Sequence, residues 1–130
     1  MTESAPEFGL SQIGQIAVNV HDLNQATAFY RDTLGMKFLF EVPNMAFFDC
    51  GGVRLMLGIA DRPEFDHPCS IIYYQVESIQ GAFDTLTLRG VKFEGRPHLV
   101  ARLPDHDLWM AFFRDVDNNL LALMSEVRRT

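Results

Sequence analysis

Residues 13–38 and 70–93 have the pattern of two copies of one structural unit. In the first copy an alternating segment ends at Val20, and a helical segment follows that ends at Gly35; Val76 and Gly90 hold the same places in the second copy. The two valines are 56 positions apart and the two glycines 55, so the offset persists across the unit. A fixed offset indicates a duplicated supersecondary unit whose halves bury apolar surface together. We therefore expect the functional surface to lie where the halves meet.

The first copy is predicted to begin with a half-buried strand over residues 13–20. Two sets of side chains alternate there, which is the pattern of a strand with one packed face. The packed set is Ile16, Val18 and Val20, and the other set is Gln15, Ala17 and Asn19. Asp22 is a favourable N-cap for the next helix, and Gly35 is expected to end it. Three short strands should follow, over residues 36–42, 45–50 and 53–59, joined by turns at Pro43-Asn44 and Gly51-Gly52.

The second copy repeats this plan. A strand over residues 70–76 leads to a helix capped by Ser78 and ended by Gly90. Strands are expected over residues 91–94 extended toward 100, then 108–114 and 120–125, with a turn at 115–119. The prediction is an α+β fold of two βαβββ modules that form a curved mixed sheet with the helices on its convex face. The domain is expected to cover residues 13–126, as module one (13–59), a linker (60–69) and module two (70–126), with tails at 1–12 and 127–130.

Composition excludes several classes of protein. At 130 residues, 48% hydrophobic and 22% charged, the chain has the make-up of one globular domain. A net charge of −6 and the lack of a basic cluster argue against nucleic acid or an anionic membrane as partner. No apolar run approaches the roughly 20 residues of a membrane span, and the amino terminus has no signal-peptide pattern. Cys50 and Cys69 lack CxxC spacing, so we expect reduced, buried thiols in a cytoplasmic protein.

Three segments resemble the vicinal oxygen chelate superfamily, which includes glyoxalase I, extradiol dioxygenases and the bleomycin resistance proteins. Residues 16–23 (IAVNVHDL) resemble the family's opening strand, and residues 29–35 (FYRDTLG) its first helix end. Residues 113–119 (FRDVDNN) resemble the turn before its last strand. The resemblance covers about residues 13–126 and implies the family's fold and a cavity on the concave face of the sheet. It does not imply one reaction, because one fold hosts many chemistries.

The resemblance also implies four positions for metal ligands in that cavity. Gln15 matches the first position and has an oxygen that could coordinate a hard ion. The other three positions fall on Met56, Ile71 and Ala122. Isoleucine and alanine have no donor atom, and hard divalent ions want oxygen or imidazole ligands. We therefore expect the usual metal site to be absent and no cofactor to be needed, although a non-standard divalent metal site that includes Gln15 stays open.

Histidine offers a different route to chemistry. His21, His67, His98 and His106 have neither HxxxH nor HxH spacing. If the hairpin around Pro104-Asp105 is tight, His98 pairs with Ala111 and shares a face with Trp109 and Phe113. His98 then lies in the cavity wall, where it is either a hydrogen-bonded strand residue or a proton shuttle.

The same alternation predicts a mostly apolar, aromatic-lined cavity with a few polar points, which suits a small organic ligand. The apolar wall would comprise Ala17, Met56, Ile71, Tyr73, Trp109, Ala111, Phe113, Ala122 and Met124, and the polar points Gln15, Asn19, Arg54, Gln75 and His98. Arg54 could hold a carboxylate or phosphate through its planar guanidinium. The alternative interpretation is that these residues fill a core between the halves.

Two functions remain open. The first is a metal-free protein that binds a small, partly aromatic molecule, as the resemblance to resistance proteins implies. The second is a glyoxalase-type lyase or isomerase, or a dioxygenase, with a non-standard metal set or with His98 and Tyr73 as acid and base. The missing ligands favour the first, because they remove the Lewis acid on which the family's chemistry depends. The resemblance further implies a homodimer.

Overall fold

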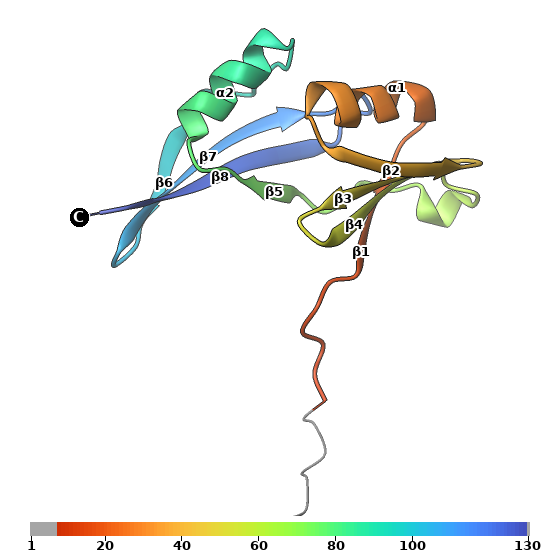
Figure 1. Cartoon of the computed structure of the whole chain (residues 1–130), viewed down its shortest axis with the longest axis horizontal. Helices are drawn as coiled ribbons and strands as arrows, with labels where there is room; N and C mark the ends of the chain where they lie inside the picture. Colours follow the sequence, from red (N-terminus) through yellow and green to blue (C-terminus); the bar gives the residue numbers. More distant parts are fainter. Residues whose placement is uncertain (1–7, 130) are drawn as a thin grey trace, which may run out of the picture.

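The computed structural model describes residues 8–129 and contains two four-stranded mixed sheets with two helices on one side of them (Figure 1). In chain order the elements are β1 (Gln15–Asn19), α1 (Leu23–Ala28), the π-helix η1 (Phe29–Thr33), β2 (Lys37–Val42), β3 (Met45–Cys50), β4 (Val53–Gly58), the 3₁₀ helix η2 (Pro63–Phe65), β5 (Ile72–Gln75), α2 (Ile79–Leu88), β6 (His98–Arg102), β7 (His106–Arg114) and β8 (Leu120–Arg128). This is the predicted βαβββ plan, present twice.

The two sheets have the same topology. The strand order is β1-β4-β3-β2 in the first and β5-β8-β7-β6 in the second. In each sheet the first strand pairs in parallel with the last strand of its module, and the other pairs are antiparallel. Each module therefore forms one sheet from its own four strands. The two sheets pair their strands in the same way, which confirms the predicted duplication.

The helices begin and end at the predicted residues. The Asp22 carboxylate accepts a hydrogen bond from the backbone N–H of Gln25 at 3.0 Å, and the Ser78 hydroxyl accepts one from the Gly81 N–H at 3.1 Å. Such side-chain acceptors satisfy N–H groups that the first turn leaves free. Gly35 and Gly90 have φ angles of +73° and +94°, the left-handed conformation in which helices commonly end. The first helix differs from expectation in that its second half is a π-helix.

The core lies between the helices and the adjoining faces of the two sheets. Val18 and Val20 of the β1 segment are each 1% exposed, and Leu121 and Leu123 of β8 point to the same layer. Tyr30 of η1 is fully buried within it. The alternation predicted for residues 13–20 is therefore confirmed, because Gln15 and Ala17 are exposed on the opposite face.

Hydrogen bonds of the β7–β8 turn join the modules. The buried Asp115 carboxylate accepts from the Tyr30 hydroxyl at 2.8 Å and from the backbone N–H groups of Asp117 and Asn119, each at 2.9 Å. The Asn119 side chain also donates to the Asn19 backbone oxygen at 3.0 Å. The family-like sequence of residues 113–119 thus forms a turn that fastens the second module to the first.

Two boundaries differ from the sequence prediction. Residues 91–94 form only an isolated bridge between Phe93 and Phe113, and the strand itself starts at His98. At the other end, β8 runs to Arg128, so the second module continues past residue 126 into the expected tail. Among the residues that the structure describes, neither helix has the length and apolar character needed to cross a lipid bilayer.

Candidate functional site

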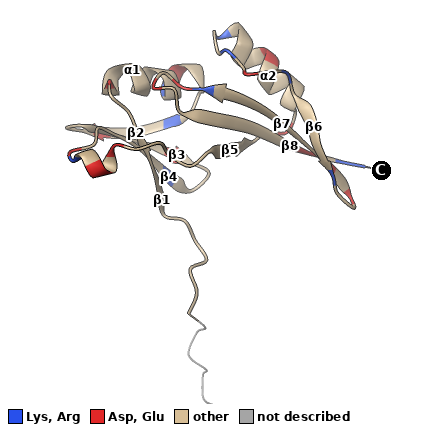
Figure 2. Ribbon diagram, turned by 180° about the vertical axis from the view of Figure 1, so that it is seen from behind, with Lys and Arg blue, Asp and Glu red and all other residues tan. Residues whose placement is uncertain are grey.

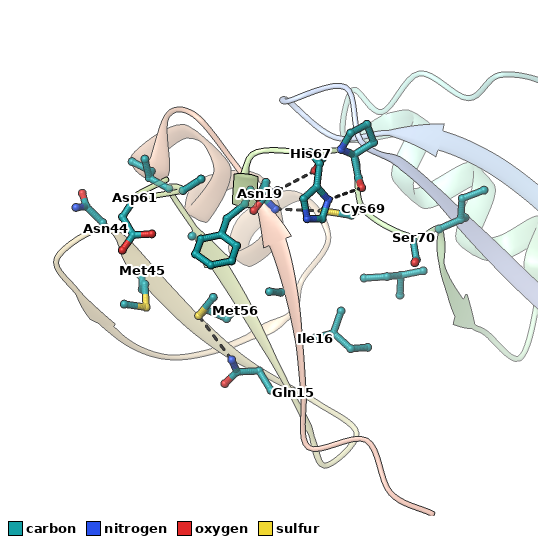
Figure 3. A pocket seen from close by; sticks show the side chains of 18 of the residues that line it. Gln15, Ile16, Asn19, Asn44, Met45, Met56, Asp61, His67, Cys69 and Ser70 are labelled. Atoms are coloured by element: carbon teal, nitrogen blue, oxygen red, sulfur yellow. Dashed lines mark hydrogen bonds between the residues drawn. The ribbon is translucent and has the colours of Figure 1, made fainter. Parts of the chain in front are cut away.

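A cleft of about 1050 Å³ opens on the sheet face opposite the helices, between the two modules. Its walls come from β1 and β4 of the first module, from the start of β5 in the second, and from the linker that joins them. Figure 3 shows the side chains of β1 and the linker converging on this space. The predicted meeting place of the halves is therefore a real cavity.

Six predicted residues line the cleft together: Gln15, Ala17, Asn19, Met56, Ile71 and Tyr73. Gln15 and Met56 come from the paired strands β1 and β4, and the Gln15 amide donates to the Met56 thioether across 3.7 Å (Figure 3). Ile71 and Tyr73 are partly exposed, at 38% and 41%, because the cleft is open. A thioether is a weak acceptor, so the Gln15 amide remains available to a better partner.

Asn19 also lines the cleft, but its side chain is already engaged. Its amide nitrogen donates to the backbone oxygens of Phe65 at 2.5 Å and His67 at 2.8 Å (Figure 3). Its backbone N–H donates to the Cys69 sulfur at 3.3 Å. Asn19 therefore holds the linker as a wall of the cleft, and its contact with a ligand stays a prediction.

His21 contacts the same linker from the other side with a side chain that is 66% exposed, and these contacts were not predicted from the sequence. Its ring nitrogens lie 3.1 Å from Asp66 of the linker and 3.1 Å from Asp117 of the β7–β8 turn. The hydrogen bonds to Asp66 and then to Asp117 raise the pKa of His21, because both carboxylates stabilise the protonated ring. Sequence gave no signal for this cluster, since its members are 45 and 96 positions apart.

The linker supplies cleft residues that the sequence did not single out. Phe65 and His67 line the cavity from this segment, and Met45 does so from β3. The linker has no periodicity from which a facing direction could be read, so its contribution required the folded chain. Met45 could have been predicted, because it lies two residues from Phe47 on β3 and so shares its face, and Phe47 pairs with Met56.

Arg54 and Gln75 lie outside the cleft lining. Arg54 pairs with Gln15 across β1 and β4, and its guanidinium lies 5.6 Å from the centre of the Phe47 ring. This cation–π contact places the guanidinium beside Phe47 and outside the lining of the cleft, in which it could have held an anionic ligand group. Gln75 is exposed at the far end of β5, two residues beyond Tyr73.

Trp109 and Phe113 were expected to line the cleft, and that expectation is wrong. Phe113 is 1% exposed, and its ring lies 5.2 Å from Phe93, which in turn lies 4.5 Å from Phe83 of α2. Trp109 packs against the same core, and so does Ala111. The odd-numbered residues of β7 therefore face the helices, and the cleft side of this strand belongs to its even-numbered residues.

His98 lies on the cleft side of its sheet, but opposite a different residue from the one expected. A bulge between Leu99 and Ala101 shifts the hairpin by one residue, so His98 pairs with Met110. A one-residue shift turns side chains to the other face. The His98 ring stacks on Phe112 at 6.3 Å.

His98 and Tyr73 do not form an acid–base pair in a common site. The Tyr73 ring lies edge-on to Phe112 at 6.0 Å, so Phe112 has His98 and Tyr73 as separate neighbours. Tyr73 lines the cleft and His98 does not. Ala122 pairs with both Tyr73 and Phe112, which covers it completely.

Few charged residues border the cleft. Strands β1 and β5, which border it, contain no charged residue, and the ribbon of both is uncharged in Figure 2. Within the described part of the chain, Asp61 is the one acidic residue that lines the cleft, and no lysine or arginine does so. The surroundings therefore disfavour an anion and accept a neutral or positively charged group.

Comparison with known proteins decides the family. The model of the Glyoxalase/Bleomycin resistance protein/Dioxygenase superfamily matches residues 12–123. The chain belongs to this superfamily. A curated relative, the uncharacterized protein YraH of Bacillus subtilis (strain 168), is 29% identical over 126 residues, with 84% of this chain and 94% of YraH covered.

Solved structures of the superfamily have the same fold. A member from Sphaerobacter thermophilus is 25% identical with a TM-score of 0.75, covering 90% of this chain and 98% of that one. A lactoylglutathione lyase from Agrobacterium tumefaciens is 21% identical with a TM-score of 0.70, covering 90% and 95%. At that identity the second likeness establishes fold alone, and the resemblance read from the sequence is confirmed.

The residues present do not fit the superfamily's divalent metal. Of the four expected ligand positions, Gln15 alone offers an oxygen; Met56 offers a thioether, and Ile71 and Ala122 offer no donor. Ala122 is also covered by its neighbours. Within residues 8–129, no group of three or more His, Cys, Asp or Glu side chains is placed to hold an ion. The donor chemistry of the cleft therefore suits an organic ligand better than a hard cation.

Proposed function

We propose that the protein binds a small, largely apolar and partly aromatic molecule in the cleft between its modules, without a metal cofactor. The observation that carries this proposal is that Met56 and Ile71 line the cleft at positions expected to hold metal ligands. Clefts of several hundred to about a thousand Å³, mostly apolar with a few polar groups, are typical of small-molecule sites. Membership of the Glyoxalase/Bleomycin resistance protein/Dioxygenase superfamily agrees with such a function.

The lining suggests how the ligand is held. Met56 and Met45 offer adaptable apolar contacts, and Tyr73 offers an aromatic face. The Gln15 amide provides one directional hydrogen bond, because its present acceptor is only a thioether. With Asp61 at the cleft and no lysine or arginine in the described lining, the ligand is neutral or carries positive charge.

Binding is favoured over catalysis by the positions of the candidate acid and base. Tyr73 reaches the cleft, whereas His98 lies beyond Phe112 and outside the lining. A general base must come within hydrogen-bond reach of the proton it removes. The His98–Tyr73 pair thus does not supply the acid and base of glyoxalase or dioxygenase chemistry in this cleft, and the expected ligand positions are poor holders of a Lewis acid.

The proposal is tested with N-phenyl-1-naphthylamine, an uncharged aromatic dye whose fluorescence rises in apolar sites. We expect saturable binding of one dye per chain, and at least about a tenfold weaker affinity in Ile71→Asp, since an apolar contact is replaced by a charge that resists desolvation. Leu88→Asp is the matched control, because Leu88 is 89% exposed on α2. The proposal fails if the dye does not bind, or if Ile71→Asp and Leu88→Asp bind it equally well.

A further inference from the structure

The imidazole ring of His21 lies between two carboxylates from distant parts of the chain. Its Nε2 atom lies 3.1 Å from Oδ1 of Asp66 in the linker, and its Nδ1 atom lies 3.1 Å from Oδ1 of Asp117 in the β7–β8 turn. An ionised carboxylate can only accept hydrogen bonds, and a neutral imidazole has a single N–H to donate. Both contacts are therefore hydrogen bonds only when the ring is protonated, because the imidazolium has two N–H groups.

The two carboxylates differ in how well water can replace the ring. The Asp117 side chain is 9% exposed, and its Oδ1 atom also accepts the His21 backbone N–H at 2.9 Å. Its second oxygen, Oδ2, is buried, and no donor within residues 8–129 reaches it. The Asp66 side chain is 48% exposed, so water can solvate it. Because a buried carboxylate without partners is costly, the last ring proton stays on Nδ1 beside Asp117, and deprotonation breaks the hydrogen bond to Asp66.

Asp66 belongs to the segment that forms one wall of the cleft. Its sequence neighbours, Phe65 and His67, both line the cleft. The Asn19 amide holds the backbone oxygens of these two neighbours, and His21 adds a charged contact to the residue between them. The wall is therefore tied to the β1 segment at three consecutive residues while His21 is protonated, and at two of them after the proton is lost.

The hydrogen bond to the linker carboxylate, and then the one to the turn carboxylate, raise the pKa of His21. Charged neighbours on the loop, the turn and the linker are engaged elsewhere. Asp22 caps α1, Asp115 accepts hydrogen bonds within its own turn, and Arg62 lies 3.2 Å from Glu64 inside the linker. The two contacts therefore titrate with His21, above its ordinary value of about 6.5.

We propose that His21 regulates the cleft: the imidazolium holds the linker wall in place against the ligand, and loss of its proton frees the wall at Asp66 and weakens binding. This inference rests on the proposed function, because it assigns a regulation to the same cleft. Ligand is held more tightly at a pH below the folded pKa of His21 than above it. Linkage is reciprocal, so a bound ligand in turn raises the pKa of His21.

The affinity for N-phenyl-1-naphthylamine, measured across pH, tests the regulation. The dye stays uncharged, so a change in affinity comes from the protein. We expect wild type to lose about two- to fivefold in affinity between about pH 6 and pH 8.5, a modest change because exposed ion pairs are weak. His21→Asn and Asp66→Asn should bind with the weaker affinity throughout. His98→Asn is the control, because His98 lies outside the cleft lining and its loss should leave the wild-type pH dependence. An equal pH dependence in wild type and His21→Asn, which both keep His67, overturns the proposal.

An NMR titration of the histidine rings tests the same coupling from the other side. The pKa of His21 should fall in Asp66→Asn and should rise when wild type is saturated with the dye, whereas the pKa of His98 should not respond to the dye. A dye that binds but leaves the pKa of His21 unchanged overturns the regulation and leaves the proposed function standing. A dye that binds at no pH overturns both, so the two failures are distinguishable.

Discussion

Removing the Tyr30 hydroxyl should weaken the junction of the two modules measurably. Tyr30 is fully buried and donates at 2.8 Å to the Asp115 carboxylate, which is itself 7% exposed. A hydrogen bond to a charged acceptor contributes about 1.5–3 kcal/mol. Phenylalanine keeps the ring, and therefore its contacts with Phe29 at 5.6 Å and Phe48 at 6.2 Å. We expect Tyr30→Phe to lower the free energy of unfolding by about 1.5–3 kcal/mol, through the lost hydrogen bond alone.

The assay is urea unfolding followed by circular dichroism, with the thermal midpoint as a second measure. At about 2.1 cal/mol/K per residue, a chain of 130 residues changes its midpoint by about 4 °C per kcal/mol, so the expected drop is about 6–12 °C. Tyr73→Phe is the control, because the Tyr73 side chain is 41% exposed on the cleft side and should stay within about 0.5 kcal/mol of wild type. A Tyr30→Phe variant equally close to wild type would refute the role given to Asp115.

Two further predictions concern β7 and the linker. Phe113→Ala should lower the free energy of unfolding by about 3–5 kcal/mol and Phe112→Ala by less, because Phe113 is 1% exposed in the core and Phe112 lies on the cleft side. Urea unfolding measures both variants. A larger loss in Phe112→Ala would contradict the assignment of Phe113 to the core face of β7. The pKa of His21 is raised by Asp66 and Asp117, so its stabilising effect is present below the unfolded pKa of about 6.5 and is lost as pH rises through the higher folded value. The difference in urea midpoint between wild type and His21→Asn should therefore shrink from about pH 6 to pH 8 and with added salt, and a difference independent of pH would argue against the ion pairs.

Local signals made the fold readable from the sequence. The alternation through Val18, the caps at Asp22 and Ser78 and the glycines at 35 and 90 each depend on neighbours within a few residues. Because these signals recur at one offset, they also gave the duplication, and with it the position of the cleft between modules. Gln15, Ala17, Asn19, Met56, Ile71 and Tyr73, predicted from strand alternation together with the family resemblance, do line that cleft.

The errors occurred where local signals were absent. Residues 108–113 are apolar on both faces of the strand, so alternation could not tell which side Phe113 takes. The bulge between Leu99 and Ala101 then moved His98 by one position in the hairpin. The hydrogen bonds from the Asn19 amide to the linker carbonyls were not predicted either, because only the folded chain brings these groups together. Contacts between distant segments decide these points, and no short pattern encodes them.

The central claim is that the cleft binds organic molecules through apolar side chains and without a metal ion. The most direct test measures the metal content of the purified protein and its affinity for N-phenyl-1-naphthylamine before and after exhaustive chelation. We predict less than a stoichiometric amount of any divalent metal and an affinity that chelation leaves unchanged, because Met56 and Ile71 offer no hard donors. One ion per chain, bound through Gln15 and lost together with dye binding, would contradict the account.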